Sequence, residues 1–172
     1  MQSVLDLVWD KLLPAMKASP LPPDDAAHKQ LQQVLQGLSL RLPVSTVSSR
    51  TVPEKAYLFP ANDRKLEAIK LVSEGRDGSG LILRVNGEEQ RLICGQAWQK
   101  GHAAWDSFPR RPVASSGAWT TEDTFTVKLC FFETPFITTF RLKFTDDELR
   151  FSGESNVGFG STREPELIGK PE

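Results

Sequence analysis

Several features are scarce in this sequence of 172 residues, and each scarcity excludes a class of protein. Only two cysteines occur, Cys94 and Cys130, and without a Cys-x-x-Cys pair a structural zinc site is excluded. No apolar run approaches the roughly 18 residues that a membrane-spanning helix needs. The 21 basic residues are balanced by 22 acidic ones, which argues against a nucleic-acid binder. What remains is one ordinary globular domain.

The two cysteines each lie in an apolar, strand-like stretch of sequence. Free cysteine is among the most buried residue types, so buried free thiols are predicted. A disulfide between neighbouring strands stays open, because spacing alone cannot decide it. Reduced thiols slightly favour the cytoplasm, and the compartment is otherwise left open. The first residues show no charged region followed by an apolar run, so a secretory signal is not expected here.

The motifs of common catalytic sites are also missing. His28 and His102 are the only histidines, and both stand in polar stretches that predict exposed side chains. There is no Gly-x-Ser-x-Gly elbow, HExxH helix, phosphate-binding loop or EF-hand pattern. No catalytic, metal or cofactor-binding residue can therefore be assigned, and no cofactor is expected.

The amino-terminal quarter of the chain has a helical pattern. Apolar residues recur at steps of three and four over residues 4–13, and Pro14 is expected to end or kink this helix. The proline-rich stretch Ser19–Pro23 predicts an extended linker. A second helix is expected to open at Asp24 or Asp25 and to end near Gly37. Residues 1–45 are thus predicted to form a helical lead-in and linker.

The rest of the chain, residues 46–172, alternates with period two and is predicted to be a β-domain. Turn sequences separate about eight short strands, and Asn86-Gly87 is the clearest hairpin signal. The fold class is therefore mainly β: an antiparallel meander closing to a lipocalin-like β-barrel, preceded by one or two α-helices. The expected strands are Lys55–Phe59, Leu66–Ser73, Leu81–Asn86, Gln90–Cys94, Ala114–Trp119, Phe125–Glu133, Phe136–Thr145 and Leu149–Gly153.

Aromatic residues are unevenly placed along this β-domain. Of 10 Phe, 9 lie after residue 100 and 7 of those fall at 125–151, on three strands predicted to form the centre of the sheet. The tryptophans Trp98, Trp105 and Trp119 could line a ligand cavity in a barrel or fill its core. Glu133 and Arg141 are the polar groups that a cavity of this kind could use, although Glu133 also suits a simple turn carboxylate.

A series of short motifs resembles a known family when the pieces are taken together and in order. The first is Val8-Trp9-Asp10-Lys11-Leu12-Leu13-Pro14-Ala15-Met16, which is similar to the segment just after the catalytic domain in bacterial serine hydrolases of the class C beta-lactamase type. The later pieces resemble the carboxy-terminal extension of the same proteins. They are Tyr57 with Asn62, Cys94-Gly95 with Trp98, Gly117-Ala118-Trp119-Thr120, Asp123-Thr124-Phe125, Glu133-Thr134-Pro135-Phe136 and Asn156-Val157-Gly158-Phe159-Gly160.

The resemblance implies a parent serine hydrolase whose catalytic domain would lie upstream of Met1, together with any signal peptide. Hydrolases of this family act on beta-lactams, esters and D-amino-acid peptides, and they need a Ser-x-x-Lys nucleophile, a Tyr-x-Asn or Ser-x-Asn motif and a Lys-Thr-Gly or His-x-Gly strand. None of the three occurs in these 172 residues. The chain is therefore predicted not to be an enzyme by this mechanism.

Two functions follow as hypotheses. In the first, the chain is an accessory domain that packs on or shapes the upstream catalytic domain of the same polypeptide, with a homodimer as a further arrangement. In the second, it is a lipocalin-like domain that binds a lipophilic small molecule. The candidate ligand or interdomain surface consists of Trp98, Trp105, Trp119, Glu133, Arg141 and Asn156.

Overall fold

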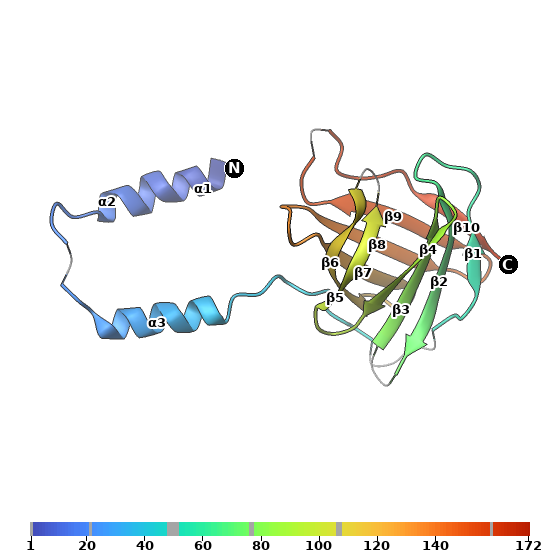
Figure 1. The fold of residues 1–172 in the computed structure, drawn as a ribbon, viewed down its shortest axis with the longest axis horizontal. Coiled ribbons are helices and arrows are strands. Elements are labelled where there is room, and N and C mark those ends of the chain that lie inside the picture. Colours follow the sequence, from blue (N-terminus) through green and yellow to red (C-terminus); the bar gives the residue numbers. More distant parts are fainter. Residues whose placement is uncertain (1, 21, 48–51, 76–77, 106–107, 159) are drawn as a thin grey trace. The chain divides into compact units, whose positions relative to one another are not determined.

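The computed structural model describes residues 2–20, 22–47, 52–75, 78–105, 108–158 and 160–172, apart from the side chain of Phe108. Its contacts divide the chain into two compact units, Met1–Leu40 and Arg41–Glu172. The first unit is helical and the second is a β-barrel (Figure 1). The barrel unit thus begins at Arg41, a little before the boundary that the sequence predicted at residue 46.

The first helical segment contains a widened turn. It runs as α1 (Gln2–Leu7), the π-helical η1 (Val8–Leu12) and α2 (Leu13–Ala15), and the N–H of Leu13 donates to the carbonyl of Val8. Pro14 has no N–H, and in a regular helix its ring would crowd the carbonyl four residues earlier. The wider turn just before Pro14 relieves that clash, so the helix continues past it to Ala15.

The second helical segment, α3 (Asp25–Gln36), has both ends capped as the sequence predicted. The backbone N–H of Ala27 donates to a carboxylate oxygen of Asp24 at 2.9 Å, which satisfies one of the free donors of the first turn. At the other end, the N–H of Gly37 donates to the carbonyls of Gln33 and Val34, each at 3.1 Å. Of the two residues proposed to open this helix, Asp24 is therefore the cap.

The barrel unit is one antiparallel sheet whose first and last strands pair with each other. The order of neighbours is β4-β3-β2-β1-β10-β9-β8-β7-β6-β5, so the described strands form a nearly closed barrel with β4 and β5 facing each other across a seam (Figure 1). The strands are β1 (Ala56–Leu58), β2 (Leu66–Glu74), β3 (Gly78–Val85), β4 (Glu88–Cys94), β5 (Gln99–Trp105), β6 (Phe108–Trp119), β7 (Thr124–Cys130), β8 (Ile137–Phe144), β9 (Leu149–Ser155) and β10 (Leu167–Pro171).

This architecture confirms the predicted fold class, and eight of the strands lie where the alternation placed them. Asn86 and Gly87 have φ of 52° and 78°, as expected for the central residues of a tight hairpin turn between β3 and β4. Two strands, β5 and β10, were not predicted. The inward positions of β5 include the small residues Gly101 and Ala103, and β10 is a five-residue strand with a glycine and a proline, so neither shows the apolar alternation of the others.

The interior of the barrel is filled largely by aromatic and branched side chains. Phe140 and Phe151 are fully buried, with ring centroids 5.1 Å apart, and the Trp119 ring lies 5.3 Å from that of Phe125. These rings come from β6, β7, β8 and β9, so the crowding of phenylalanine in the second half of the sequence corresponds to one side of the core.

The seam between β4 and β5 has no backbone ladder among the described residues. At one end of the seam, side chains of β6 bond to the end of β4: the Ser115 hydroxyl donates to the Ile93 carbonyl and the Ser116 hydroxyl to the Gly95 carbonyl, each at 2.8 Å. Further along, the N–H of Ala104 donates to the side-chain oxygen of Gln90 at 2.6 Å. The buried Gln90 side chain therefore takes the place of a neighbouring strand's carbonyl.

The segment that precedes β1 is fixed to the outer face of the barrel. The Lys128 ammonium donates to the carbonyl of Arg41 at 2.8 Å. The N–H and hydroxyl of Thr46 donate to the carbonyls of Trp119 and Thr120 at 3.1 and 2.8 Å. Val47 then packs against the core. Residues 41–47 are thus part of the barrel unit rather than a loose linker.

Gly117 offers a test of how tightly the barrel is packed. A Cβ atom at this position would lie 2.9 Å from Cys94 Cβ and from the Phe125 ring. We expect Gly117→Val to lower the free energy of unfolding by about 1–3 kcal/mol, because the core would have to shift. Urea unfolding measures this, with Gly101→Ala as control, since a Cβ there meets nothing within 4 Å. Equal losses in both variants would contradict tight packing at Gly117.

Candidate functional site

The helical unit exposes its apolar side chains. None of the described residues of α1, η1, α2 and α3 is buried, and Trp9 is 66% exposed. We call the large exposed apolar residues of this unit the lead-in surface. It consists of Val4, Leu5, Leu7, Trp9, Leu12, Leu13, Met16, Leu31, Val34, Leu35, Leu38 and Leu40.

Such a surface is unusual, because an amphipathic helix ordinarily buries its apolar stripe against another element. Exposed apolar helix faces of this kind are typical of interaction sites. Within the part of the chain that the structure describes, no helix combines the length and the apolar character that crossing a membrane requires.

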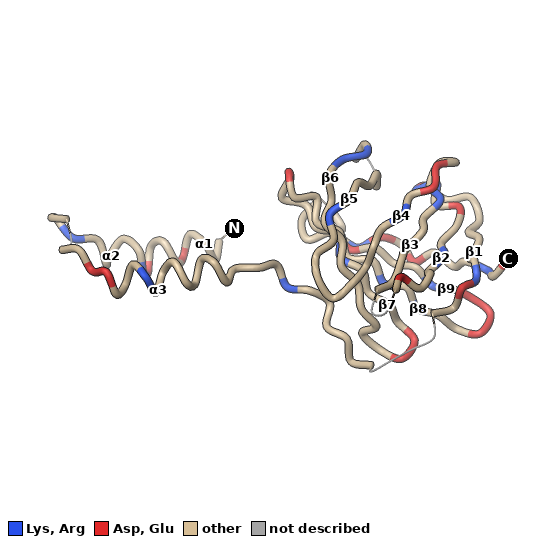
Figure 2. The backbone as a smooth tube through the Cα atoms, turned by 60° about the horizontal axis from the view of Figure 1, so that its bottom comes forward, with Lys and Arg blue, Asp and Glu red and all other residues tan. Residues whose placement is uncertain are grey.

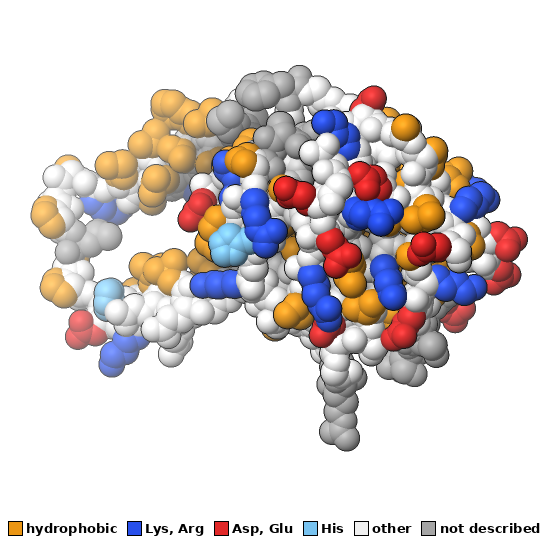
Figure 3. All heavy atoms as spheres, turned by 45° about the vertical axis from the view of Figure 1, so that its right-hand side comes forward, with side chains coloured by type: hydrophobic (Ala, Val, Ile, Leu, Met, Phe, Trp, Pro, Cys, Tyr) orange, Lys and Arg blue, Asp and Glu red, His pale blue; other side chains and the backbone are white. Residues whose placement is uncertain are grey.

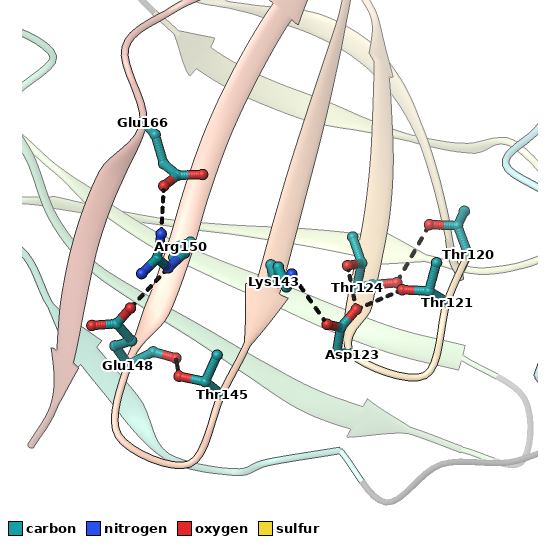
Figure 4. Close-up of polar contacts among 9 residues, drawn as sticks. All are labelled: Thr120, Thr121, Asp123, Thr124, Lys143, Thr145, Glu148, Arg150 and Glu166. Atoms are coloured by element: carbon teal, nitrogen blue, oxygen red, sulfur yellow. Dashed lines mark hydrogen bonds and ion pairs between the residues drawn. The ribbon is translucent and has the colours of Figure 1, made fainter.

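The outer face of the barrel, in contrast, carries charges of both signs, spread along the strands and turns (Figures 2 and 3). Several of these charges form ion pairs between neighbouring strands or turns (Figure 4). The Arg150 guanidinium lies 2.8 Å from a carboxylate oxygen of Glu148 and 3.3 Å from one of Glu166. The Lys143 ammonium lies 3.5 Å from a carboxylate oxygen of Asp123. Hydrogen bonds from Lys170 and Arg150 lower the pKa of Glu148. The charges on this face therefore neutralise one another across the strands.

Asp123, in the turn between β6 and β7, has the most strongly shifted carboxylate of this face. The hydroxyls of Thr121 and Thr124 each donate to it at 2.7 Å (Figure 4). These two bonds, with the charge of Lys143 nearby, lower the pKa of Asp123 from 3.8 to about 2. The turn is thus held by its own carboxylate.

This shift gives an expected pH dependence. Because the folded pKa of Asp123 lies below the unfolded value, its stabilising effect is complete above about pH 4 and is lost as the pH falls toward 2. Between pH 5 and pH 2.5, wild type should lose more of its free energy of unfolding than Asp123→Asn, as urea unfolding at both values would show. The control is Asp146→Asn in the exposed turn after β8, which should behave as wild type does. Equal losses in wild type and Asp123→Asn would contradict this role.

Two of the candidate tryptophans lie inside the barrel. Trp105 is 3% exposed, and its indole packs edge-on against Phe140 at 4.5 Å and Phe151 at 5.7 Å. Trp119 is 8% exposed and contacts Phe125 and Phe144. Both therefore contribute to the core, and Trp98, in the link between β4 and β5, is half-buried.

The polar candidates lie elsewhere. Arg141 is exposed on the outer face and pairs with Glu154 at 2.9 Å, and Glu133 is exposed in the turn after β7. Neither side chain lines the interior, so the prediction that they could serve a cavity inside the barrel is wrong. The turn that holds Glu133 is bonded instead through Thr134, whose hydroxyl donates to the carbonyl of Phe131 at 2.7 Å and accepts from the N–H of Phe136 at 3.2 Å.

Asn156 joins the end of β9 to the turn between β7 and β8. Its amide donates to the carbonyl of Pro135 at 2.9 Å and accepts from the N–H of Ile137 at 2.8 Å. The last of the expected strands, Leu149–Gly153, is not the final strand of the barrel, because β10 comes later in the chain. The structure thus gives Asn156 a structural role at this end of the barrel.

At the same end of the barrel, a cleft of about 450 Å³ opens between the loops before β2 and before β10. It is lined by Ala61, Asn62, Asp63, Arg64, Glu164, Pro165 and Leu167. Arg64 pairs with Glu164 at 3.2 Å, and the Glu164 side chain is only 10% exposed. The Asn62 side chain shapes the loop, since its oxygen accepts from the backbone N–H groups of Arg64 and Leu66. We call this the mouth cleft.

Glu164 also reaches the inner wall of the barrel. A Cβ atom on Gly153 would lie 2.5 Å from a Glu164 carboxylate oxygen, and Gly153 faces the same side of β9 as the buried Phe151. Only a glycine leaves room for the carboxylate at this point. Sequence reasoning missed these residues, because Arg64 and Glu164 stand in polar loops without a motif and only the fold brings them together.

The remaining reactive groups do not gather at the cleft. Cys94 and Cys130 are free and buried, as predicted, and burial raises the pKa of both thiols, that of Cys94 to about 12. His28 and His102 are exposed, on α3 and on the outer face of β5. Among the residues that the structure describes, no group of three or more His, Cys, Asp or Glu could hold a metal ion.

The candidate sites are therefore the lead-in surface of the helical unit and the mouth cleft of the barrel. In the comparisons with known proteins, no family model matches the chain and no curated protein matches it.

Proposed function

We propose that this chain is a non-catalytic accessory domain of a beta-lactamase-like serine hydrolase, which docks on the catalytic domain through the lead-in surface. One observation carries the proposal: the helical unit exposes twelve large apolar side chains and buries none of its described residues. The ordered motif series described above supports the choice of this partner.

The difference between the two units, one with a core and one without, fits this proposal. The barrel unit has its own filled core, so it can remain folded without the helical unit. Residues 41–47, which follow the helical unit, are hydrogen-bonded to the outer face of β6 and β7. The lead-in surface is then left to contact a partner, and such contacts are dominated by a few buried aromatic and aliphatic anchors. Trp9 is the natural anchor of this surface.

The chemistry of the chain supports a non-catalytic role. The thiolate is the reactive form of cysteine, and both thiols are buried with a raised pKa. The Ser-x-x-Lys, Tyr-x-Asn and Lys-Thr-Gly motifs of the proposed parent do not occur in the sequence. Hydrolysis would then belong wholly to the catalytic domain.

Enzyme assays on the full chain test this role. We expect no turnover of nitrocefin or of p-nitrophenyl acetate above the rate in buffer. Turnover that scales with protein concentration would contradict the non-catalytic role. The coding sequence upstream of Met1 should encode a Ser-x-x-Lys motif in frame, and without that motif the choice of partner fails.

The lead-in surface could instead pair with a second copy of the chain. Size-exclusion chromatography with light scattering separates the two arrangements. A monomer that binds the catalytic domain supports the proposal, whereas a dimer that resists dissociation and excludes the catalytic domain overturns it.

A second candidate function is favoured by one specific observation. The indole nitrogen of Trp105 is buried within the barrel and has no hydrogen-bond partner. Buried donors are nearly always bonded, and a barrel interior is a common place for a small ligand. The alternative function that we propose is therefore that of a lipocalin-like barrel that binds a small molecule.

A further inference from the structure

We propose that Asn86, in the turn between β3 and β4, is a site of spontaneous deamidation whose rate is controlled by Glu67 on β2. Asn86 is the only asparagine of the sequence that is followed by a glycine. Both residues of this dipeptide are exposed, so water has access to the turn. This slow covalent change in the barrel is independent of the two functions proposed above.

The reaction needs only the chain and water. The backbone nitrogen of Gly87 attacks the side-chain carbonyl carbon of Asn86, and a C–N bond forms. The N–H proton passes through water to the side-chain NH2 group, whose bond to carbon breaks and which leaves as ammonia. Water then opens the resulting cyclic imide at either carbonyl, so the product is aspartate or isoaspartate. Glycine favours the first step, because it has no side chain to shield its nitrogen.

The turn holds the Gly87 nitrogen in an unreactive position. Asn86 and Gly87 have φ of 52° and 78°, the pattern of a type I′ turn. With the backbone torsions of that turn, the Gly87 nitrogen points away from the Asn86 side chain. The peptide unit between the two residues must therefore turn over before the ring can close.

Glu67 fixes this peptide unit from the neighbouring strand. The N–H of Gly87 donates to one carboxylate oxygen of Glu67 at 2.8 Å, and the other oxygen lies 3.0 Å from Nε of Arg84. Turning the peptide unit over would break the bond to Gly87, which is strengthened by the charge of its acceptor. The negative charge also disfavours loss of the N–H proton, which makes the nitrogen a poorer nucleophile. Glu67 thus retards the reaction in two ways.

The other two asparagines provide internal controls. Asn62 is followed by aspartate and Asn156 by valine, whose side chains hinder the following nitrogen. The side-chain oxygens of both asparagines accept backbone N–H bonds, at 3.1 Å for Asn62 and 2.8 Å for Asn156. Both are therefore expected to remain amides while Asn86 converts.

Deamidation would alter the turn and the strand that follows it. Both products add a negative charge to a turn that already contacts Glu67 and is followed by Glu88. Isoaspartate also carries the backbone through the side-chain carbon, which lengthens a two-residue turn by one bond. Further along β4, Gln90 accepts the N–H of Ala104 across the seam. We therefore expect conversion of Asn86 to loosen the seam at Ala104.

The test is incubation of the full chain at neutral pH, followed by peptide mapping with mass spectrometry, which quantifies each asparagine separately. Asn86 should convert about tenfold more slowly in folded wild type than in the chain unfolded in guanidinium chloride, because the hydrogen-bonded turn must open first. Glu67→Ala should convert about tenfold faster than wild type, as loss of one charge-assisted hydrogen bond allows. Glu67→Gln, which keeps an acceptor without the charge, should lie between the two.

Arg84→Gln is the matched control, because it removes the ion-pair partner of Glu67 and leaves the bond to Gly87. It should convert no faster than wild type, and acceleration equal to that of Glu67→Ala would overturn the role of this bond. A wild-type rate in Glu67→Ala would overturn it as well. An Asn86 that stays intact in the unfolded chain would overturn the site itself.

Two further measurements need no variant. If Glu67→Ala does not fold, the comparison of folded with unfolded wild type still decides, since equal rates in the two would contradict protection by the turn. In the converted protein, hydrogen exchange at the Ala104 amide should be faster than before conversion. An unchanged exchange rate at Ala104 would overturn the expected loosening of the seam.

Discussion

Phe140→Ala is expected to lower the free energy of unfolding of the barrel by about 3–5 kcal/mol. Phe140 is fully buried on β8, and its ring lies 4.5 Å from that of Trp105 and 5.1 Å from that of Phe151. Truncation removes apolar burial and leaves a cavity that these rings cannot close. Urea unfolding at neutral pH, followed by near-UV circular dichroism, measures the loss.

The matched control for this variant is Phe132→Ala. Phe132 belongs to the same phenylalanine-rich region, but it is 47% exposed, and its neighbour is the ammonium of Lys100, 5.9 Å from the ring centroid. Its removal should change the free energy of unfolding by no more than about 0.5 kcal/mol. If the two variants lost similar amounts, the filled aromatic core described for the barrel would be wrong.

Trp9→Ala is expected to weaken binding of the chain to the proposed catalytic domain by about 30-fold or more, the effect of losing one anchor of an interface. Trp9 is 66% exposed in the helical unit, so the variant loses no intramolecular packing of note. The free energy of unfolding of the barrel should therefore stay as in wild type. Isothermal titration calorimetry with the separately produced catalytic domain measures the affinity.

Phe132→Ala serves here as well, since it removes an exposed aromatic side chain from the barrel unit instead. It should leave the affinity unchanged. Full affinity in Trp9→Ala, or an equal loss in Phe132→Ala, would show that the lead-in surface is not the docking surface.

Much of the fold could be predicted because apolar alternation is strong where strands carry large side chains. β7 and β8 are the clearest cases, and the Asn86-Gly87 turn has the backbone conformation that its sequence favours. β5 and β10 were not predicted, because their inward positions include glycine and alanine and so lack a clear apolar alternation. Such strands are recognised by the ladder they join, which is a property of the closed barrel and not of the local sequence.

The candidate site was less predictable than the fold. Because side chains alternate between the two faces of a strand, Arg141 is expected on the face of β8 that does not carry Phe140 and Leu142. The structure shows Arg141 exposed on that face, beside Glu154. The mouth cleft has no comparable signal. Arg64 and Glu164 are a hundred residues apart in the sequence, and only the pairing of β1 with β10 brings their loops together.

The central claim, docking through the lead-in surface, is tested most directly by hydrogen exchange of the full chain with and without the serine hydrolase domain that we propose as its partner. In the chain alone, amides of α1, η1 and α3 should exchange much faster than those of β7 and β8, because the helices lack a core. Adding the catalytic domain should slow exchange in the helices and leave the barrel strands unchanged. Helices whose exchange is unaffected by the catalytic domain would contradict the account.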